Sequence, residues 1–371
     1  MDYISKIKNL KILYNKNQLD INDIISFIEL KKSFDDLEEL HLFLLSELNK
    51  LYENEISIAN ANVCKVSASA LECLDKCDDT KTGGRIHFLN NDLATYYVFG
   101  DIHSDSISVI EFLKRISFVE KMQHEQNIRL IFLGDYVDRG KAAIKTLELI
   151  FILKYIFSSN VFLLRGNHDG GKIISENEYK LCVGRNENTT DNDYFVASLF
   201  NSLKELNKPL TLLEEYLNYF SKLCHIALIK NCDEVILCVH GGIPRPKNDG
   251  YDHILTINDL WNEDIVDSLD GSVIHNMLWS DPTEDTTLQR NTRRFYFYKT
   301  HFDSFTSKFS ISTIIRGHQA FDEGYKEFFA GRLLSIFSSG EIKENNNETA
   351  YKDITPCILK IHDGKKEIVR L

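Results

Sequence analysis

The sequence predicts an α/β domain built around a largely buried sheet and preceded by a helical N-terminal segment. From about residue 95 onward, short runs rich in β-branched and aromatic residues alternate with amphipathic stretches of helical spacing. Several of these runs are apolar throughout, which is typical of strands covered on both faces. The chain has 371 residues, enough to bury a large core.

The first 56 residues show helical periodicity alone. Apolar residues recur near helical spacing, with acidic residues and lysines between them. The composition then turns polar and glycine-rich over residues 78–92, which indicates a boundary. We therefore expect a helical N-terminal extension over residues 1–90, serving for packing or for binding a partner, and a second domain over residues 91–371.

Six β-rich runs define the expected sheet of the second domain, and amphipathic stretches at 105–119 and 141–157 are expected helices between them. The chain ends in a predicted hairpin that turns at Asp363 and Gly364. The six runs are 95–100, 128–134, 160–166, 234–242, 312–318 and 332–339.

Composition and charge exclude several classes of protein. The chain has 55 acidic against 43 basic residues, a net charge of −12, which disfavours nucleic acid as a partner. No apolar stretch is long enough to span a membrane, and the N-terminus lacks the apolar core of a signal peptide. We expect a cytoplasmic protein, although delivery into another cell stays open. All eight cysteines are accordingly expected to be reduced, with zinc bound by Cys64, Cys73 and Cys77 as a minor alternative.

Five of the predicted strands end in residues that bind divalent metals. Because the carboxyl ends of strands in an α/β sheet open onto one crevice, these side chains are expected to converge. Carboxylate, imidazole and amide groups together suit Mn, Fe, Zn or related ions. One such residue after a strand would be weak evidence, since most are caps or turn residues, but five motifs in order are strong evidence. They are Asp101 and His103, Asp135, Asn167 and His168, His240, and His318.

The order GDIH, GDYVDRG, RGNHD, HGG and RGH resembles the metallophosphoesterases, and more narrowly the PPP family of serine/threonine protein phosphatases, the calcineurin-like group. The stretches MLWSDP at 277–282 and RGHQAFDEGYKEFFAGRLLSIFSS at 316–339 support the narrower resemblance. It covers roughly residues 95–340. It implies the calcineurin-like metallophosphoesterase fold, with two central mixed β-sheets flanked by helices, and makes residues 91–371 the catalytic domain.

The resemblance also implies a site for two divalent metal ions. Asp101 and His103 correspond to ligands of the first ion, and Asp135 to the ligand shared by both. The second ion would be bound by Asn167, His240 and His318. Manganese is the expected metal, with iron or zinc as alternatives. Such a pair lowers the pKa of a bridging water, and the resulting hydroxide attacks phosphorus directly.

Four further positions match catalytic residues of the family. His168 resembles its general acid, and Asp138 the carboxylate that orients the acid. Arg139 and Arg293 match the arginines that bind the substrate phosphate, to which Asn167 also contributes. For the second arginine the adjacent Arg294 stays an alternative. Arg165 and Arg316 are expected to brace the loops rather than to bind phosphate.

The sequence departs from the family in the loops that border the cleft. Asp169 stands where the family has glutamate, and we expect this shorter side chain to brace its loop less well. Ser104 replaces a glycine, HGGIPRP at 240–246 replaces HGGLSP, and the segment between Asn167 and His240 is longer than usual. The family's SAPNY tyrosine is missing after residue 339, where SSGEIKENNNE stands instead.

The expected function is a metal-dependent phosphoprotein phosphatase that hydrolyses phosphomonoesters of serine or threonine, and of tyrosine if the missing loop widens the cleft. The alternative is a phosphatase of small molecules, including dinucleoside polyphosphates. An inactive fold used as a binding scaffold is less favoured, because inactive relatives usually lose metal ligands or the general acid, and this sequence keeps both.

Overall fold

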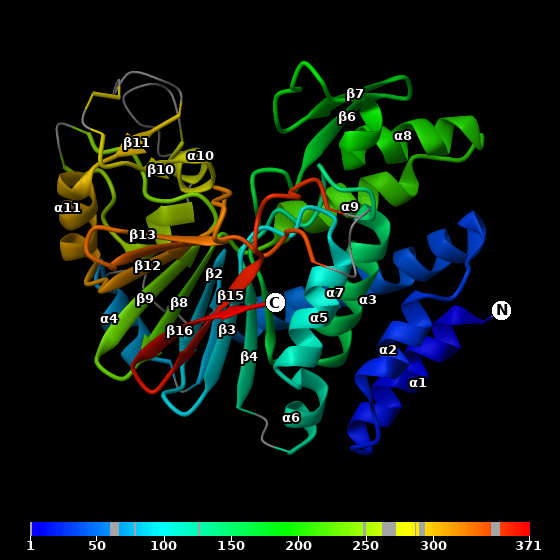
Figure 1. Cartoon of the computed structure of the whole chain (residues 1–371), viewed down its shortest axis with the longest axis horizontal. Helices are drawn as coiled ribbons and strands as arrows, with labels where there is room; N and C mark the ends of the chain where they lie inside the picture. The colour runs from blue at the N-terminus through cyan, green and yellow to red at the C-terminus, as the bar shows by residue number, and fades with distance from the viewer. Residues whose placement is uncertain are drawn as a thin grey trace.

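Two mixed sheets lie at the centre of the protein, with helices on their outer faces (Figure 1). The computed structural model describes residues 2–59, 67–77, 79–124, 127–247, 250–261, 272–285, 287–288, 294–342 and 349–371. Among them, no helix is both long and apolar enough to cross a membrane.

The larger sheet has seven strands and mixes parallel with antiparallel pairs. β2 with β8, β9 with β12, and β12 with β14 run parallel, and the other three pairs run antiparallel. In sheet order the strands are β1 (Thr80–Gly83), β2 (Ile86–Asn90), β8 (Ile226–Asn231), β9 (Glu234–Val239), β12 (Thr313–Arg316), β14 (Leu333–Ile336) and β13 (Tyr325–Phe328).

The smaller sheet has five strands, of which β3, β4 and β5 are parallel and carry the first site motifs. Its order is β16 (Lys365–Arg370), β15 (Cys357–His362), β3 (Thr95–Phe99), β4 (Ile128–Phe132) and β5 (Val161–Leu163). β15 and β16 form the expected C-terminal hairpin, and Asp363 and Gly364 both have the positive φ that a tight turn of this kind requires.

Three apolar layers hold the architecture together. The middle layer joins the inner faces of both sheets, for example Val98 and Ile131 from one and Ile236 and Ile315 from the other. The outer face of the five-stranded sheet packs on most of the helices, and that of the seven-stranded sheet on α4, α10 and α11. Strand residues are buried on both faces, which explains why the sequence runs are apolar throughout.

The helices fall into an N-terminal group and those that alternate with strands. In the N-terminal group, α3 packs on α7 and α9, so these helices lie against the part of the chain that carries the two sheets. The helices are α1 (Tyr3–Asn15), α2 (Ile21–Ile28), α3 (Phe34–Ala59), α4 (Ala70–Asp75), α5 (Ser106–Arg115), α6 (Phe118–His124), α7 (Ala143–Ile156), α8 (Phe195–Glu205), α9 (Thr211–Lys222), α10 (Val273–Trp279) and α11 (Lys299–Phe309).

All six predicted strands are present, but the structure corrects the interpretation of one region. Residues 80–90, expected within the helical extension, form strands β1 and β2, because Ile86–Asn90 pairs with β8 of the large sheet. The division of the chain at residue 90 stays a prediction. Two further elements were not foreseen, the hairpin of β6 (Gly171–Ser175) and β7 (Glu178–Leu181), and the short pair β10 (Asp281–Pro282) and β11 (Tyr296–Phe297).

The expectation that every cysteine is reduced is wrong for Cys73, which is disulfide-bonded. The other described cysteines form no disulfide, namely Cys77, Cys182, Cys224, Cys232, Cys238 and Cys357. Cys64 lies outside the described residues.

Candidate active site

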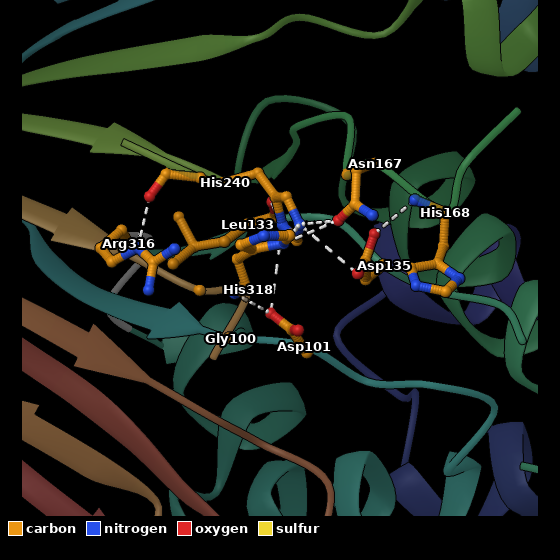
Figure 2. A network of polar contacts seen from close by, with 12 residues as sticks. Gly100, Asp101, Leu133, Asp135, Asn167, His168, His240, Arg316 and His318 are labelled. Carbon is orange, nitrogen blue, oxygen red and sulfur yellow. Dashed lines mark hydrogen bonds and ion pairs between the residues drawn. The ribbon is translucent and has the colours of Figure 1, made fainter. Parts of the chain in front are cut away.

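The predicted metal-binding residues come together at the carboxyl ends of strands from both sheets, and Figure 2 shows several of them pointing toward one another. An isolated parallel bridge between Asp101 and Phe337 joins the two sheets at this edge. Asp101 follows β3, Asp135 follows β4, Asn167 and His168 follow β5, His240 follows β9 and His318 follows β12.

Asn167, His240 and His318 form the first half of the site. The side-chain oxygen of Asn167 lies 2.7 Å from Nε2 of His240 and 2.8 Å from Nδ1 of His318. The two ring nitrogens are only 3.2 Å apart, and Oδ2 of Asp135 lies 3.4 Å from Nε2 of His240. Ligand atoms of Asp135, His240 and His318 are thus close enough to share one metal ion.

Asp101, His103 and Asp135 form the second half. Nε2 of His103 lies 3.6 Å from Oδ2 of Asp101 and 3.6 Å from Oδ2 of Asp135. Nδ1 of His103 contacts the carbonyl oxygen of Val137 at 3.0 Å, which leaves Nε2 directed at the carboxylates. Asp135 therefore contacts histidines of both halves, as expected of a shared ligand.

The backbone at the site adopts conformations that L-residues seldom use. Six non-glycine residues of the motifs have positive φ, and such strain persists where the surrounding structure enforces it. At Asp135, for example, φ is 55°, and its N–H donates to Asp169 at 2.7 Å. The six residues are His103, Ser104, Asp135, Asp138, Arg139 and His318.

Two glycines allow the carboxylates to approach the neighbouring loops. A Cβ at Gly166 would lie 2.1 Å from Oδ1 of Asp135, and one at Gly317 would lie 2.4 Å from Oδ1 of Asp101. Any side chain at either position would displace a ligand, so the motifs RGNH and RGH need glycine before their metal-binding residues.

The buried carboxylates and histidines perturb one another. Burial and the neighbouring Asp135 raise the pKa of Asp101 to about 7. Burial would lower the pKa of His240, but Asp135 and Asp101 raise it to about 9. Burial acts to raise the pKa of Asp135 as well, yet His240 and His168 hold it well below its usual value. The two buried carboxylates therefore favour positive charge beside them, which the protonated imidazoles supply here and which a divalent cation could supply instead.

His168 and Asp138 form a hydrogen-bonded pair beside the predicted metal ligands. Nδ1 of His168 lies 2.7 Å from Oδ2 of Asp138, and the backbone N–H of His168 donates to Oδ1 of Asp135 at 2.8 Å. Burial opposes protonation, but Asp135 and Asp138 raise the pKa of His168. The imidazole is thereby oriented toward the metal-binding residues with its charged form favoured.

Arg139 acts electrostatically on His168. Its guanidinium carbon lies 5.7 Å from the ring centre of Tyr194, and no carboxylate among the described residues forms an ion pair with it. Arg293 lies outside the described residues. The adjacent Arg294 is described: its Nε lies 2.5 Å from Oδ2 of Asp281, and its guanidinium contacts His318.

The loops of the site are braced by the buried Asp169 and Arg316 and by the partly buried Arg165. Asp169 accepts from the N–H groups of Asp135, Tyr136 and Gly166 at 2.7, 2.9 and 2.8 Å, so the expected weakening of this brace is wrong. The shorter side chain is sufficient because the two loops approach it closely. Arg165 donates to the carbonyl of Asp169, and the fully buried Arg316 binds Asp281 at 2.9 Å. Both arginines contact loop residues, as expected.

Tyr351 is a site residue that the sequence reasoning missed. Its ring lies over His103, with centroids 5.3 Å apart and planes inclined by 28°, and it packs edge-on against Phe337 at 4.7 Å. Asp101, Asp135, Asp138 and Arg139 all act electrostatically on its hydroxyl. The resemblance places the family tyrosine directly after residue 339, whereas this aromatic ring enters the site from further along the chain.

The fold and site define a metallophosphoesterase. The family model of calcineurin-like phosphoesterases matches residues 94–321, and the chain belongs to this family. The chain is 27% identical over 288 residues to the catalytic subunit of serine/threonine-protein phosphatase 6 of Caenorhabditis elegans, covering 73% of this chain and 74% of that one. It is 26% identical to the serine/threonine-protein phosphatase BSL2 of Arabidopsis thaliana, covering 65% of this chain and 22% of the relative.

Relatives differ in length, and a solved structure confirms the fold. The chain spans 50% of two relatives named as serine/threonine-protein phosphatases, from Caenorhabditis elegans at 27% identity and Encephalitozoon cuniculi at 26%. They match 69% and 70% of this chain. A Saccharomyces cerevisiae protein serine/threonine phosphatase, described as similar to human phosphatase PP5, matches with a TM-score of 0.60 and 18% identity. It covers 90% of this chain and 89% of its own.

Proposed function

We propose that this protein is a metal-dependent phosphoprotein phosphatase that hydrolyses phosphomonoesters. The observation that carries the proposal is that Asp135 belongs to both side-chain groups that could hold a metal ion, one with His103 and His168 and one with His240 and His318. Asp138 is hydrogen-bonded to His168. The names of the relatives support protein substrates, because they are serine/threonine-protein phosphatases. A scaffold without activity would not need to keep these buried, mutually perturbed groups together.

The donor set fits two divalent ions. Asp101, His103 and Asp135 would hold one ion, and Asp135, Asn167, His240 and His318 the other. Nitrogens of His240 and His318 lie 3.2 Å apart, and both face one amide oxygen, an arrangement that a cation between them would satisfy. When bound, the ions would supply positive charge to the phosphoryl oxygens and lower the pKa of a water.

The other side chains take the remaining roles. Arg139 and Arg293, with Asn167, bind phosphate oxygens, since a planar guanidinium matches two of them at once. His168 donates a proton to the leaving oxygen from its Nε2, and Asp138 holds Nδ1 and stabilises the imidazolium. Tyr351 forms the wall beside His103 and thereby limits the space for the leaving group.

Several finer points belong to the same proposal. Manganese is the metal that we expect, since oxygen and nitrogen ligands suit it, and the physiological location is the cytoplasm. Phosphoserine and phosphothreonine are the expected substrates, with phosphotyrosine still open. A partner would bind the N-terminal helices on the side turned away from the catalytic body, where Ile12 is exposed.

A metal-reconstitution assay tests the proposal. Protein stripped of metal is given Mn²⁺, Fe²⁺ or Zn²⁺ and assayed with p-nitrophenyl phosphate, matched phosphoserine, phosphothreonine and phosphotyrosine peptides, and diadenosine tetraphosphate. We expect metal-dependent turnover with peptides preferred over the dinucleotide. Full turnover of metal-stripped protein in excess chelator would refute the dimetal mechanism, and a preference for the dinucleotide would refute the protein substrate.

A further inference from the structure

Three successive residues lie against Asp138 and Arg139. Asp193 and Tyr194 contact Arg139, and Phe195 contacts Asp138. The carbonyl of Asp193 accepts from the N–H of Arg139 at 2.9 Å, and the N–H of Phe195 donates to Oδ1 of Asp138 at 2.7 Å. The ring of Tyr194 lies 5.7 Å from the guanidinium of Arg139. We propose that residues 193–195, the clamp segment, position the carboxylate that supports the general acid and the arginine that binds phosphate. The inference rests on the proposed function.

The contact with Asp138 fixes the orientation of its carboxylate. Oδ2 faces Nδ1 of His168 at 2.7 Å, while Oδ1 accepts from the N–H of Phe195. Phe195 is the first residue of α8, so this N–H has no partner within the helix, and the positive end of the helix favours a carboxylate there. Asp138 is buried, so without this donor its second oxygen would lose a hydrogen bond away from water.

The contact with Arg139 orients the guanidinium without using its N–H groups. An aromatic face attracts a cation through its quadrupole and takes none of the hydrogen-bond donors. Since no carboxylate in the described part of the chain pairs with Arg139, its donors stay available to a phosphate. The ring of Tyr194 is fully buried, and Arg185 lies 5.5 Å from its centre.

The clamp segment is itself held in one shape. The N–H of Thr190 and its hydroxyl both donate to Oδ2 of Asp193, at 2.7 and 2.9 Å. The hydroxyl of Tyr194 accepts from the N–H of Asn186 at 3.1 Å, and Thr189 lies 2.9 Å from it. These contacts close the long segment after His168 onto itself beside α8 and the hairpin of β6 and β7 (Figure 1). A rigid support of this kind keeps catalytic side chains in place.

Replacing Phe195 with proline tests the support of Asp138. Proline is well tolerated at the first position of a helix, and Tyr194 has the extended conformation (φ −127°, ψ 120°) that a following proline requires. The substitution removes the N–H and puts the ring Cδ where the proton was, so Asp138 must turn away. Phe195→Ala is the control, because it loses the same aromatic ring and keeps the N–H.

For Phe195→Pro we expect both metals to remain bound, and kcat on phosphoserine peptide to fall about tenfold or more below that of Phe195→Ala. On p-nitrophenyl phosphate the two variants should differ much less, because its leaving group hardly needs a proton. If Phe195→Pro and Phe195→Ala lower kcat by the same factor on each of the two substrates, Phe195 has only a packing role and the inference is wrong.

Tyr194→Leu and Tyr194→Phe test the support of Arg139 independently. Leucine removes the aromatic face, so KM and the inhibition constant of inorganic phosphate should rise about threefold to fivefold. Phenylalanine keeps the face and loses only the hydroxyl contacts with Asn186 and Thr189, so both values should rise less. Equal values in the two variants would overturn this part. Should Tyr194→Leu fail to fold, the comparison of Phe195→Pro with Phe195→Ala still decides whether the clamp segment positions Asp138. Wild-type protein that binds metal but is inactive would instead refute the proposed function. The failure of the proposed function is thereby distinguished from the failure of this inference.

Discussion

At Asp135 a single carboxylate contacts both groups of proposed metal ligands and the loop of His168, the proposed general acid. Oδ2 lies 3.4 Å from His240 and 3.6 Å from His103, while Oδ1 accepts from the N–H of His168 at 2.8 Å. The residue also has a positive φ, and Gly166 leaves no room for its displacement. A change at this residue therefore affects metal binding and the acid together, whereas a change at His168 affects the acid alone.

Asp135→Asn should lose both metal and activity, because the amide replaces a charged oxygen that two cations share. The measurement is metal content per chain by plasma mass spectrometry, together with turnover of p-nitrophenyl phosphate in added Mn²⁺. Asp303→Asn is a suitable control, since this carboxylate on α11 pairs with Lys299 of the same helix and with Arg332, which directly precedes β14. Two metals and normal turnover in Asp135→Asn would contradict a shared ligand.

His168→Asn should keep both metals and lose about 10²–10⁴-fold in kcat on phosphoserine peptide, the usual contribution of a general acid. Asp138→Asn should cause a smaller loss in the same direction, because it weakens the hydrogen bond of 2.7 Å to Nδ1 but keeps the imidazole. Both losses should shrink on p-nitrophenyl phosphate. The same loss on poor and good leaving groups would show that His168 has another role.

Arg139→Ala should lower kcat and raise KM on every phosphate substrate, because the arginine binds the group that all of them share. Arg139→Lys should restore only part of the activity, since a point charge lacks the two-pronged geometry. The measurement is kcat and KM for phosphoserine and phosphotyrosine peptides side by side. A change in the preference between them, without a general loss, would assign Arg139 to specificity instead.

The elements that could be predicted are those marked by a pattern of neighbouring residues in the sequence. β3, β4, β9 and β12 are apolar runs that end in glycine and a metal-binding residue, so both the strand and its side chain could be placed from sequence. Convergence of the residues also followed, since the carboxyl ends of strands share one edge. The hairpin of β6 and β7 carries no such signal: it is short, polar and exposed, and its pairing depends on packing against α8 and α9.

The position of Tyr351 depended on long-range packing. Thr349, close before it, is buried against Ser339, and this contact turns the chain so that the tyrosine ring lies over His103. Part of the 340–350 loop, to which we assign substrate preference, lies outside the described residues. The described end of the segment nevertheless supplies an aromatic wall to the site, and the choice between substrates is expected to depend on it.

Tyr351→Ala should raise kcat/KM for a phosphotyrosine peptide relative to a phosphoserine peptide of matched sequence. Removal of the ring opens space beside His103 for an aromatic leaving group. Tyr351→Phe keeps the ring and should leave the ratio near that of wild type. If Tyr351→Ala lowers kcat/KM equally for both peptides, Tyr351 supports His103 without selecting the substrate. The substrate preference would then depend on the remainder of the loop.

For the whole molecule, the structure relates the N-terminal helices closely to the catalytic body. Buried residues of α1, α2 and α3 belong to the same apolar layer as those of α5, α7 and α9. A buried ionic group crosses this boundary: Nζ of Lys32 lies 2.9 Å from Glu148 on α7, and Nε2 of His41 lies 3.5 Å from the same carboxylate. The sequence showed the helices, but amphipathic periodicity alone does not reveal which surface an apolar face covers.

Lys32→Met should therefore destabilise the entire protein and not the N-terminal helices alone. Removing the ammonium leaves Glu148 buried without its cation, which costs about 3–5 kcal/mol of unfolding free energy. Lys145→Met is the control: Lys145 pairs with Glu29 at 2.8 Å near the same boundary but in contact with solvent, so about 1 kcal/mol or less is expected. Urea unfolding followed by circular dichroism and by phosphatase activity measures both. If the helices unfold first while activity persists, α1 to α3 fold separately from the rest of the chain; a single shifted transition means that they complete the core of the proposed catalytic domain.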